Sequence, residues 1–448
     1  MEWIIKKVLP LPEEPSRRAL AAGRPGVFRD MGVALLSHAL SSKGATDKGL
    51  SRKIRAERRL GSKDRPLVMS VLYGVLRRKR LLERLLLEAS HPIDSLNLWQ
   101  LELMLSQGLK PEDVGLSECL HDSAGVLKEW LDQKDVEHRD ALSTLTSLPL
   151  WLVENLSGQE SEEDLVSLCL SLSEPAQTTL RVNTLRCTVE ELSRVLQEQG
   201  VSIQSGFYSL EALRVDGRPN LMGSKAFREG LFEIQDEASQ LIAELVEPVR
   251  GGLHLDYCAG AGGKSLALAA KLPRQAKILA TDIRESALKC AEHRAERAGA
   301  KRIAFHCLQD GPLPIAAQSA ARVLVDAPCT GTGTLRRQPV RKWRMTERDL
   351  SQSIRLQEQI LRDASAWVRP GGRLVYATCS VLRAENEEIV RAFLEEHPAW
   401  SLVFPREILG RSRSKPFERE GFFRSYPHLH STDGFTAAIL VAPRAEPL

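Results

Sequence analysis

The stretch Leu253-His-Leu-Asp-Tyr-Cys-Ala-Gly-Ala-Gly-Gly-Lys-Ser265 decides the fold class of this 448-residue chain. Its first part, within residues 252–258, is a short apolar run of the kind that forms a buried strand. The glycines that follow let the backbone turn tightly and approach a ligand. The helix expected next presents its first amides to that turn. Strand, glycine-rich turn and helix in this order predict an open α/β sheet with a ligand site at its edge.

Strand-like and helix-like segments alternate from this stretch to the end of the chain. The further strands are expected at residues 276–283, 302–308, 322–327, 373–378 and 434–442, and the helices at 285–298, 346–368 and 385–396. Such alternation predicts a parallel sheet covered by helices on both faces. The predicted fold class is therefore α/β, with a Rossmann-like domain at residues 250–448.

Two segments precede this domain. Residues 1–150 have the composition and period of helices, and Gly74 is placed to allow a close contact between two of them. Residues 151–249 mix helices with a strand-like run from Thr179 to Leu185 and a part punctuated by glycine and proline. We therefore expect a helical domain at 1–150 and a linking subdomain at 151–249.

Basic residues are unevenly distributed, although the net charge is only +4. Residues 43–84 carry a net charge of +10, residues 85–150 carry −8, and residues 334–373 carry +6. Two basic segments suit a phosphate-rich partner, while solvated helix faces explain either segment alone equally well. The run Arg77-Arg-Lys-Arg80 is the candidate for phosphate contacts.

Several classes of protein are disfavoured. The eight cysteines include no Cys-x-x-Cys pair, so we expect no zinc site, and a chain of this size does not need disulfides. No apolar run reaches the ~18 residues of a membrane span, and residues 1–10 do not resemble a secretory signal. We expect a cytoplasmic protein without a metal or a membrane partner.

An acidic residue supports a nucleoside cofactor at the glycine-rich turn. Asp282 ends the second strand, 22 residues after Gly260, where a carboxylate can accept hydrogen bonds from ribose hydroxyls. Asp310, just past the third strand, either reaches the adenine edge or is an ordinary turn residue. The loop has Cys258 where a Walker motif needs glycine and Ser265 where a dinucleotide motif needs it. S-adenosylmethionine is therefore favoured over ATP and NAD.

Two cysteines follow neighbouring strands of the predicted sheet, one in Asp326-Ala-Pro-Cys329 and one in Thr378-Cys379-Ser380. A lone cysteine is usually a buried apolar residue, but two at adjacent strand ends beside a carboxylate indicate chemistry. A thiolate that adds to carbon 6 of cytosine activates carbon 5 towards a methyl donor. Asp326 is the candidate acid at N3, and the second cysteine can assist release of the product.

These motifs together resemble the Nop2/Sun family of RNA methyltransferases, and in particular its RsmB/Sun (Fmu) type, which methylates carbon 5 of cytosine in 16S rRNA. The matching stretches are Arg181-Val-Asn-Thr-Leu185, Gln235-Asp-Glu-Ala-Ser239, Asp256-Tyr-Cys-Ala-Gly-Ala-Gly-Gly-Lys264, Asp326-Ala-Pro-Cys329, Thr378-Cys-Ser380 and Asp433-Gly-Phe435. The family loop usually reads Cys-Ala-Ala-Pro-Gly-Gly-Lys, so this chain lacks the proline. That loss should loosen the turn and keep its amides.

The resemblance implies roles for individual residues. It makes Cys379 the nucleophile, Cys329 the residue that aids release, and Lys264 a neighbour of the catalytic Asp326. The implied contacts of S-adenosylmethionine are Cys258, Ala259, Gly260, Ala261, Gly262, Gly263, Lys264, Asp282, Asp310 and Asp326. The motif Leu72-Tyr-Gly-Val-Leu-Arg77 further resembles the NusB-like RNA-binding domain of RsmB-type members.

Two other interpretations remain open at this point. A DNA cytosine-5 methyltransferase uses a Pro-Cys nucleophile, which Pro328-Cys329 would supply; the Cys379 motif favours RNA. A non-catalytic RNA-binding factor could keep the same fold, against which the intact Cys329, Cys379, Lys264 and Asp326 argue. The sequence leaves open which cytosine is modified and whether the substrate is tRNA.

Overall fold

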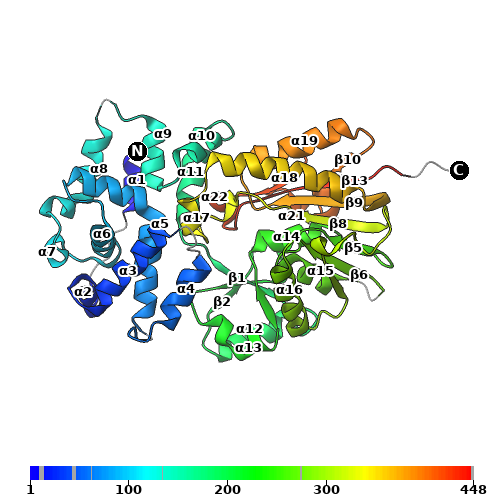
Figure 1. The fold of residues 1–448 in the computed structure, drawn as a ribbon, viewed down its shortest axis with the longest axis horizontal. Coiled ribbons are helices and arrows are strands. Elements are labelled where there is room, and N and C mark those ends of the chain that lie inside the picture. The colour runs from blue at the N-terminus through cyan, green and yellow to red at the C-terminus, as the bar shows by residue number, and fades with distance from the viewer. Residues whose placement is uncertain (10–14, 43–46, 62, 134, 273–274, 445–448) are drawn as a thin grey trace. The chain divides into compact units, whose positions relative to one another are not determined.

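The computed structural model describes residues 1–9, 15–42, 47–61, 63–133, 135–272 and 275–444. They form two compact units (Figure 1). Unit 1 comprises Met1–Pro175 and a later segment, Leu335–Thr346; unit 2 comprises Ala176–Thr334 and Glu347–Leu448. Among the described residues, no helix is long and apolar enough to cross a membrane.

Unit 1 is helical wherever the structure describes regular elements, as the period of residues 1–150 predicts. Its helices are α1 (Glu2–Val8), α2 (Arg17–Gly23), α3 (Val27–Ser41), α4 (Asp47–Ala56), α5 (Arg65–Glu88), α6 (Ser95–Gln107), α7 (Pro111–Val114), α8 (Ser123–Leu131), α9 (His138–Thr146), α10 (Leu150–Ser157), α11 (Glu162–Ser173) and α17 (Pro339–Lys342). The close contact expected at Gly74 is confirmed, because a Cβ there would overlap the carboxylate of Glu102 in α6.

The segment Leu335–Thr346 belongs to unit 1, although the residues before and after it in sequence belong to unit 2. Its Lys342 is 1% exposed and donates to the carbonyls of Arg77 (2.9 Å) and Thr146 (3.3 Å) and to Oγ of Ser173 (3.1 Å). These three acceptors match the three N–H groups of an ammonium. Burial lowers the pKa of Lys342 well below its ordinary value. Lys342, which counts toward the basic segment at residues 334–373, is therefore a buried residue that joins parts of unit 1 by hydrogen bonds.

The basic run at residues 77–80 is also engaged inside unit 1. Arg78 forms an ion pair of 2.5 Å with Glu102, whose side chain is 1% exposed. Lys79 pairs with Glu83 at 2.5 Å, and Arg80 with Asp140 at 3.4 Å. The exposed basic side chains of the same segment lie instead on α4 and just after it, at Arg52, Lys53, Arg55, Arg58 and Arg59.

Unit 2 contains a small antiparallel sheet with the strand order β2-β3-β1-β4. Its strands are β1 (Thr178–Val182), β2 (Ile203–Ser205), β3 (Ala212–Val215) and β4 (Phe232–Ile234). One face packs against α12 (Val189–Glu198) and α13 (Lys225–Arg228) through a buried cluster that includes Leu180, Leu192 and Phe232. Because side chains alternate along a strand, Thr179 and Arg181 of β1 point to the opposite face.

The large sheet of unit 2 has the order β11-β12-β13-β9-β8-β5-β6-β7 among the described residues, with β10 paired to β13. Its strands are β5 (Leu253–Asp256), β6 (Lys277–Asp282), β7 (Ile303–Cys307), β8 (Ala320–Asp326), β9 (Val368–Thr378), β10 (Ser401–Val403), β11 (Glu418–Arg419), β12 (Phe422–Ser425) and β13 (Phe435–Val441). The strands from β9 to β7 are parallel, as the sequence predicts. The last strand, β13, is antiparallel to β9, so the sheet is mixed.

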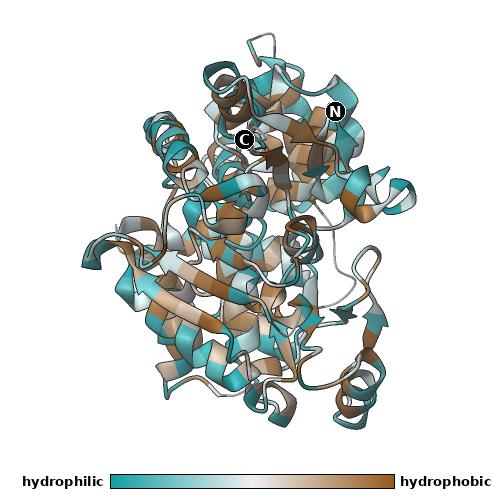
Figure 2. Ribbon diagram, turned by 90° about the vertical axis from the view of Figure 1, so that its right-hand side faces the viewer, coloured by the Kyte–Doolittle hydropathy of each residue, from teal (hydrophilic) through white to brown (hydrophobic). Residues whose placement is uncertain are grey.

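Helices cover both faces of this sheet (Figure 1). On one side lie α14 (Glu237–Leu245), α15 (Gly263–Lys271) and α16 (Glu285–Ala298), and on the other α18 (Glu347–Ser365) and α19 (Glu387–Glu396). Teal and brown residues alternate along the helices, as expected for helices with one face in the core (Figure 2). Three short helices complete the unit: α20 (Arg406–Leu409), α21 (Arg411–Ser414) and α22 (Pro427–His430). The α/β expectation is confirmed for this part of the chain.

Candidate active site

The glycine-rich loop joins the C-terminal end of β5 to the N-terminus of α15. The amide of Ala259 donates to the carbonyl of Thr281 at 2.8 Å, which ties the loop to β6. Gly262 precedes the helix with a φ of 77°, a left-handed conformation that glycine adopts without strain. Arg294 of α16 donates to the carbonyl of Ala261 at 2.5 Å. The loop is thus fixed from two sides, with the first turn of α15 behind it.

Asp282 lies at the end of β6, beside the loop, and is 6% exposed. Its Oδ2 accepts a hydrogen bond of 2.9 Å from the amide of Gly260, and Arg284 donates to both carboxylate oxygens. Burial acts to raise the pKa of Asp282, but the hydrogen bonds from Arg284 outweigh it, and the pKa is lowered. Asp282 is therefore an ionised acceptor at the edge where the sequence places a ribose.

A second carboxylate, Asp256, lies beneath the loop and was not assigned a role from the sequence. It is completely buried, and Ser265 of α15 donates to its Oδ2 at 2.5 Å. Its Oδ1 has no hydrogen-bond partner among the described residues. Burial raises the pKa of Asp256 to about 7. In the sequence, Asp256 is a single polar residue within an apolar strand, and nothing in that pattern marks it as a functional residue.

The edge above β5 and β6 suits a nucleoside-type cofactor. The turn presents backbone amides, an ionised carboxylate ends the next strand, and one oxygen of Asp256 lacks a partner among the residues described. Cys258 and Gly263 lie at the two ends of the turn. Asp310 is exposed and lies past the end of β7 at the same edge, in a single turn of 3-10 helix (Leu308–Asp310).

Lys264, in the first turn of α15, reaches the end of β8. Its Nζ lies 2.6 Å from Oδ2 of Asp326 and 5.0 Å from the ring centroid of Phe435. The lysine side chain is 9% exposed and that of Asp326 is 33% exposed. The carboxylate is therefore paired with a cation on one side and open to a ligand on the other.

The two cysteines expected at adjacent strand ends are in contact. Sγ of Cys329, after β8, lies 3.4 Å from Sγ of Cys379, after β9, and neither forms a disulfide. The hydrogen bond with Cys379, together with burial, raises the pKa of the Cys329 thiol well above its ordinary value. Cys329 is therefore held in its protonated form at neutral pH.

A buried glutamate that the sequence analysis missed holds the Cys329 loop. Glu385, which is 0% exposed, accepts from the amide of Thr330 at 2.8 Å and from its hydroxyl. Gln357 of α18 donates both to Glu385 (3.0 Å) and to the carbonyl of Pro328 (2.9 Å). Only the tertiary structure brings these residues together.

The Cys379 loop is held in a similar way. Asn386 donates to the carbonyls of Ser380 (3.1 Å) and Leu382 (2.7 Å) and accepts from Oγ1 of Thr378. The amide of Gly333 donates to the carbonyl of Cys379, and the amide of Gly434 to the carbonyl of Gly333, both at 2.9 Å. The loops that carry the two thiols are therefore joined to each other and to the Asp433-Gly-Phe435 motif. The described residues contain no cluster of histidines, cysteines and carboxylates suited to a metal.

Two known families match parts of the chain. Residues 243–441 match the family described as 16S rRNA methyltransferase RsmB/F, and residues 148–221 match the ferredoxin-like domain of RsmF/B-like methyltransferases. The chain is 28% identical over 414 residues to the probable ribosomal RNA small subunit methyltransferase B of Bacillus subtilis, covering 86% of this chain and 92% of that protein. It is 30% identical over 309 residues to the ribosomal RNA small subunit methyltransferase B of Proteus mirabilis, covering 67% and 70%.

Solved structures show the same fold. The crystal structure of PH0851 superposes with a TM-score of 0.74 at 26% identity, covering 92% of this chain and 98% of that one. NSun6 from Pyrococcus horikoshii, crystallised with SFG, gives a TM-score of 0.57 at 22% identity and covers 66% of this chain and 99% of that one.

Proposed function

Since the chain belongs to the RsmB/F family of 16S rRNA methyltransferases, we propose that it transfers a methyl group from S-adenosylmethionine to carbon 5 of a cytosine in 16S rRNA. The assignment to carbon 5 of cytosine rests on the contact between the thiols of Cys329 and Cys379, which lie 3.4 Å apart. Methylation of an exocyclic nitrogen or a ribose hydroxyl needs no thiol nucleophile, whereas carbon 5 of cytosine does.

The cofactor would be held at the edge above β5 and β6. Its ribose hydroxyls would donate to Asp282, and Asp310 is the candidate for the adenine edge. The turn from Cys258 to Gly263 (Cys258, Ala259, Gly260, Ala261, Gly262 and Gly263) would supply backbone contacts, with Lys264 and Asp326 beyond it. When bound, S-adenosylmethionine supplies an activated methyl group.

The residues of the chain would act on the base in sequence. The thiolate of Cys379 adds to carbon 6, and the electron pair of the carbon 5–carbon 6 double bond becomes available at carbon 5. Asp326 and Lys264, an ion pair of 2.6 Å, hold a proton at N3 as charge develops there. After transfer a water molecule takes the carbon 5 proton, the electron pair of that C–H bond forms the double bond to carbon 6 again, and the sulfur of Cys379 departs as a thiolate with the electron pair of the C–S bond.

The two thiols would have different tasks. The Thr378-Cys379-Ser380 motif makes Cys379 the attacking thiol, and Cys329 follows Pro328 in the neighbouring loop. Its contact with Cys379 places it where it can assist release of that sulfur. In the DNA-type arrangement, by contrast, the cysteine after Pro328 attacks.

Unit 1 would bind the RNA. We propose that it is a NusB-like domain, supported by its helical structure and by the exposed basic residues around α4. Residues 151–249 would add RNA contacts beside the catalytic domain at 250–448.

The test of the proposed reaction is product analysis. The purified protein is incubated with an unmodified 16S rRNA transcript and methyl-labelled S-adenosylmethionine, and the RNA is digested to nucleosides for mass spectrometry. We expect 5-methylcytidine, at a position then located by bisulfite sequencing. A label on another nucleoside would overturn the carbon 5 assignment. RNA binding without any transfer would favour a non-catalytic assembly factor.

A further inference from the structure

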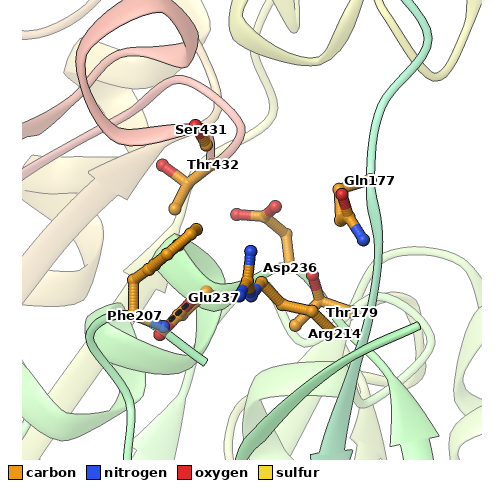
Figure 3. A pocket seen from close by; sticks show the side chains of 8 residues that line it. All are labelled: Gln177, Thr179, Phe207, Arg214, Asp236, Glu237, Ser431 and Thr432. Atoms are coloured by element: carbon orange, nitrogen blue, oxygen red, sulfur yellow. Dashed lines mark hydrogen bonds between the residues drawn. The ribbon is translucent and has the colours of Figure 1, made fainter. Parts of the chain in front are cut away.

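A polar pocket of unit 2 lies apart from the catalytic residues, between the small sheet and the loop after α22 (Figure 3). It encloses about 110 Å³. Its walls come from β1 and β3, the start of α14, the loop of Phe207 and the turn at Ser431 and Thr432. The proposed chemistry uses none of these residues.

Phe207 is an exposed aromatic side chain on a fixed backbone. Its side chain points into the pocket (Figure 3) and the residue is 57% exposed. The carboxylate of Glu237, itself 2% exposed, accepts hydrogen bonds from the backbone amides of Phe207 (3.1 Å), Tyr208 and Ser209 (2.6 Å). The backbone that carries the exposed ring is thus held in place. A ligand that stacks on it would not have to order this loop first.

Arg214 of β3 stacks on one face of this ring. Its guanidinium carbon lies 3.7 Å from the ring centroid of Phe207, and its Nε and Nη2 donate to Ser205 (3.0 Å) and Gln204 (2.7 Å). These bonds fix the guanidinium plane. Nucleic-acid bases in single strands stack on aromatic rings and on arginine planes of this kind.

The charges of the pocket select a base over a phosphate. The carboxylates of Asp236 and Glu237 line it against one cation, Arg214, so the lining is net negative and disfavours a phosphate. Asp236 caps α14 by accepting from the amide of Ala238 at 2.9 Å, so its position is set by the helix. A carboxylate accepts hydrogen bonds from the N–H groups at the edge of a base.

The pocket is connected by a few residues to the catalytic edge. Thr432, in its wall, is two residues from Gly434, a span of at most about 7 Å of extended chain. Gly434 donates to Gly333, and Gly333 to the carbonyl of Cys379. The pocket therefore lies within reach of a nucleotide next to one whose base is at Cys379.

On the basis of the proposed RNA methyl transfer, we propose that the Phe207–Arg214 pocket binds the base of a nucleotide that flanks the target cytosine. The base stacks on an open face of the stacked Phe207–Arg214 pair and gives an N–H edge to Asp236. It fixes the register of the RNA strand, so that one particular cytosine reaches Cys379.

The experiment combines variants of the protein with changes in the RNA. Phe207→Ala is compared with Phe207→Tyr, which restores a ring, and with Leu210→Ala. Leu210 is a matched control, since it is 83% exposed, lies in the same loop and does not line the pocket. The substrates are short single-stranded RNAs that contain the unmodified target cytosine, each with one flanking nucleotide replaced by an abasic residue.

We expect Phe207→Ala to raise KM for RNA roughly 10- to 100-fold, the range expected when one base stack is removed, and to leave kcat at saturating RNA unchanged. Phe207→Tyr and Leu210→Ala should behave as the wild type. An abasic residue at one flanking position should reproduce the effect, and combining it with Phe207→Ala should add nothing further. An unchanged KM, or an effect that is additive with every abasic position, would overturn the proposal.

Failure of the proposed function is distinguishable from failure of this pocket. The nucleoside produced by the wild-type protein decides the reaction by itself. The affinity of Phe207→Ala for the 16S rRNA transcript, measured without S-adenosylmethionine, reports on the pocket whatever the product is. Equal affinity of wild type and Phe207→Ala in that measurement would count against the pocket alone.

Discussion

The two cysteines show how the fold brings side chains that are distant in sequence into contact. Both thiols follow buried parallel strands and touch at 3.4 Å, and the shared hydrogen bond together with burial raises the pKa of Cys329. Their order in sequence and their convergence could be predicted, because parallel strands end at one edge of a sheet. The pKa of Cys329 could not, since it depends on tertiary contacts.

Variants of the two cysteines should therefore behave differently. Cys379→Ala should abolish methyl transfer and form no covalent adduct with RNA. Cys329→Ala should still attack the base but stall before release, giving a protein–RNA complex that survives denaturing electrophoresis and requires S-adenosylmethionine. The target base must leave its stack, so a rigid duplex should be a poor substrate. An adduct with the Cys379 variant and none with the Cys329 variant would reverse the assignment.

Asp282→Ala should weaken binding of S-adenosylmethionine by roughly 1.5–3 kcal/mol, the value of a hydrogen bond to a charged group. The carboxylate also accepts from the amide of Gly260, so part of the effect would come from a looser turn. Calorimetry on the folded variant measures the change. Asp310→Ala, on the exposed turn, is the comparison that tests the adenine contact. Equal affinity of Asp282→Ala and wild type for S-adenosylmethionine would show that the ribose does not bind at the end of β6.

Asp256 should make the stability of the protein depend on pH. Its folded-state pKa of about 7 lies above the ordinary value of 3.8, so unfolding releases a proton between these limits. Stability from this group is complete below pH ~4 and falls by about 1.4 kcal/mol per pH unit until pH ~7. Asp256→Asn should flatten this slope and be more stable than wild type at pH 8. Urea unfolding between pH 5 and 8 measures both; parallel curves would contradict the buried, protonated state.

At the scale of elements, the period of apolar residues predicted the parallel strands and their helices well. The helix expected at residues 285–298 is α16, and the strand expected at 322–327 is β8, shifted by one or two residues. The short antiparallel strands β10, β11 and β12 were not predicted. Segments of two to four residues are too short to show a period, and their pairing is set by the sheet that they join.

The role of the buried Glu385 could not be predicted either, because its partners come from a separate helix and a loop. Glu385→Gln should loosen the loop that carries Cys329, since it removes the charge that holds Thr330. We expect slower turnover at an unchanged affinity for S-adenosylmethionine, with some trapped adduct. Glu388→Gln, at an exposed position of α19, is the matched control. A normal rate of product release in Glu385→Gln would show that the loop of Cys329 keeps its position without the charge of Glu385.

At the scale of the whole molecule, net charge by segment was an incomplete guide. The basic run at residues 77–80 and Lys342 are engaged within unit 1, whereas α4 exposes its basic side chains. Charge counts do not distinguish a paired arginine from a solvated one.

Arg52→Ala combined with Arg55→Ala on α4 should weaken binding of 16S rRNA and reduce its salt slope by about 0.7 to 1 for each phosphate that is no longer neutralised. Arg78→Ala should instead destabilise unit 1 by roughly 3–5 kcal/mol, because it leaves the buried Glu102 unpaired. Filter binding at several salt concentrations and thermal unfolding measure the two effects. An unchanged salt slope in the α4 variant would mean that RNA binds elsewhere.

The position of Leu335–Thr346 within unit 1 has a consequence for the order of events during translation. The carbonyls of Arg77 and Thr146 are made early, yet the ammonium of Lys342 that bonds to them is added much later. At a synthesis rate of about 5–20 residues per second, the ribosome needs roughly 10–30 seconds to pass from residue 175 to residue 346. During that interval the first unit is on its own and lacks part of its interior. Unit 1 can be completed only after the glycine-rich loop and the Cys329 loop have left the ribosome. The two units of the nascent chain therefore do not fold one after the other.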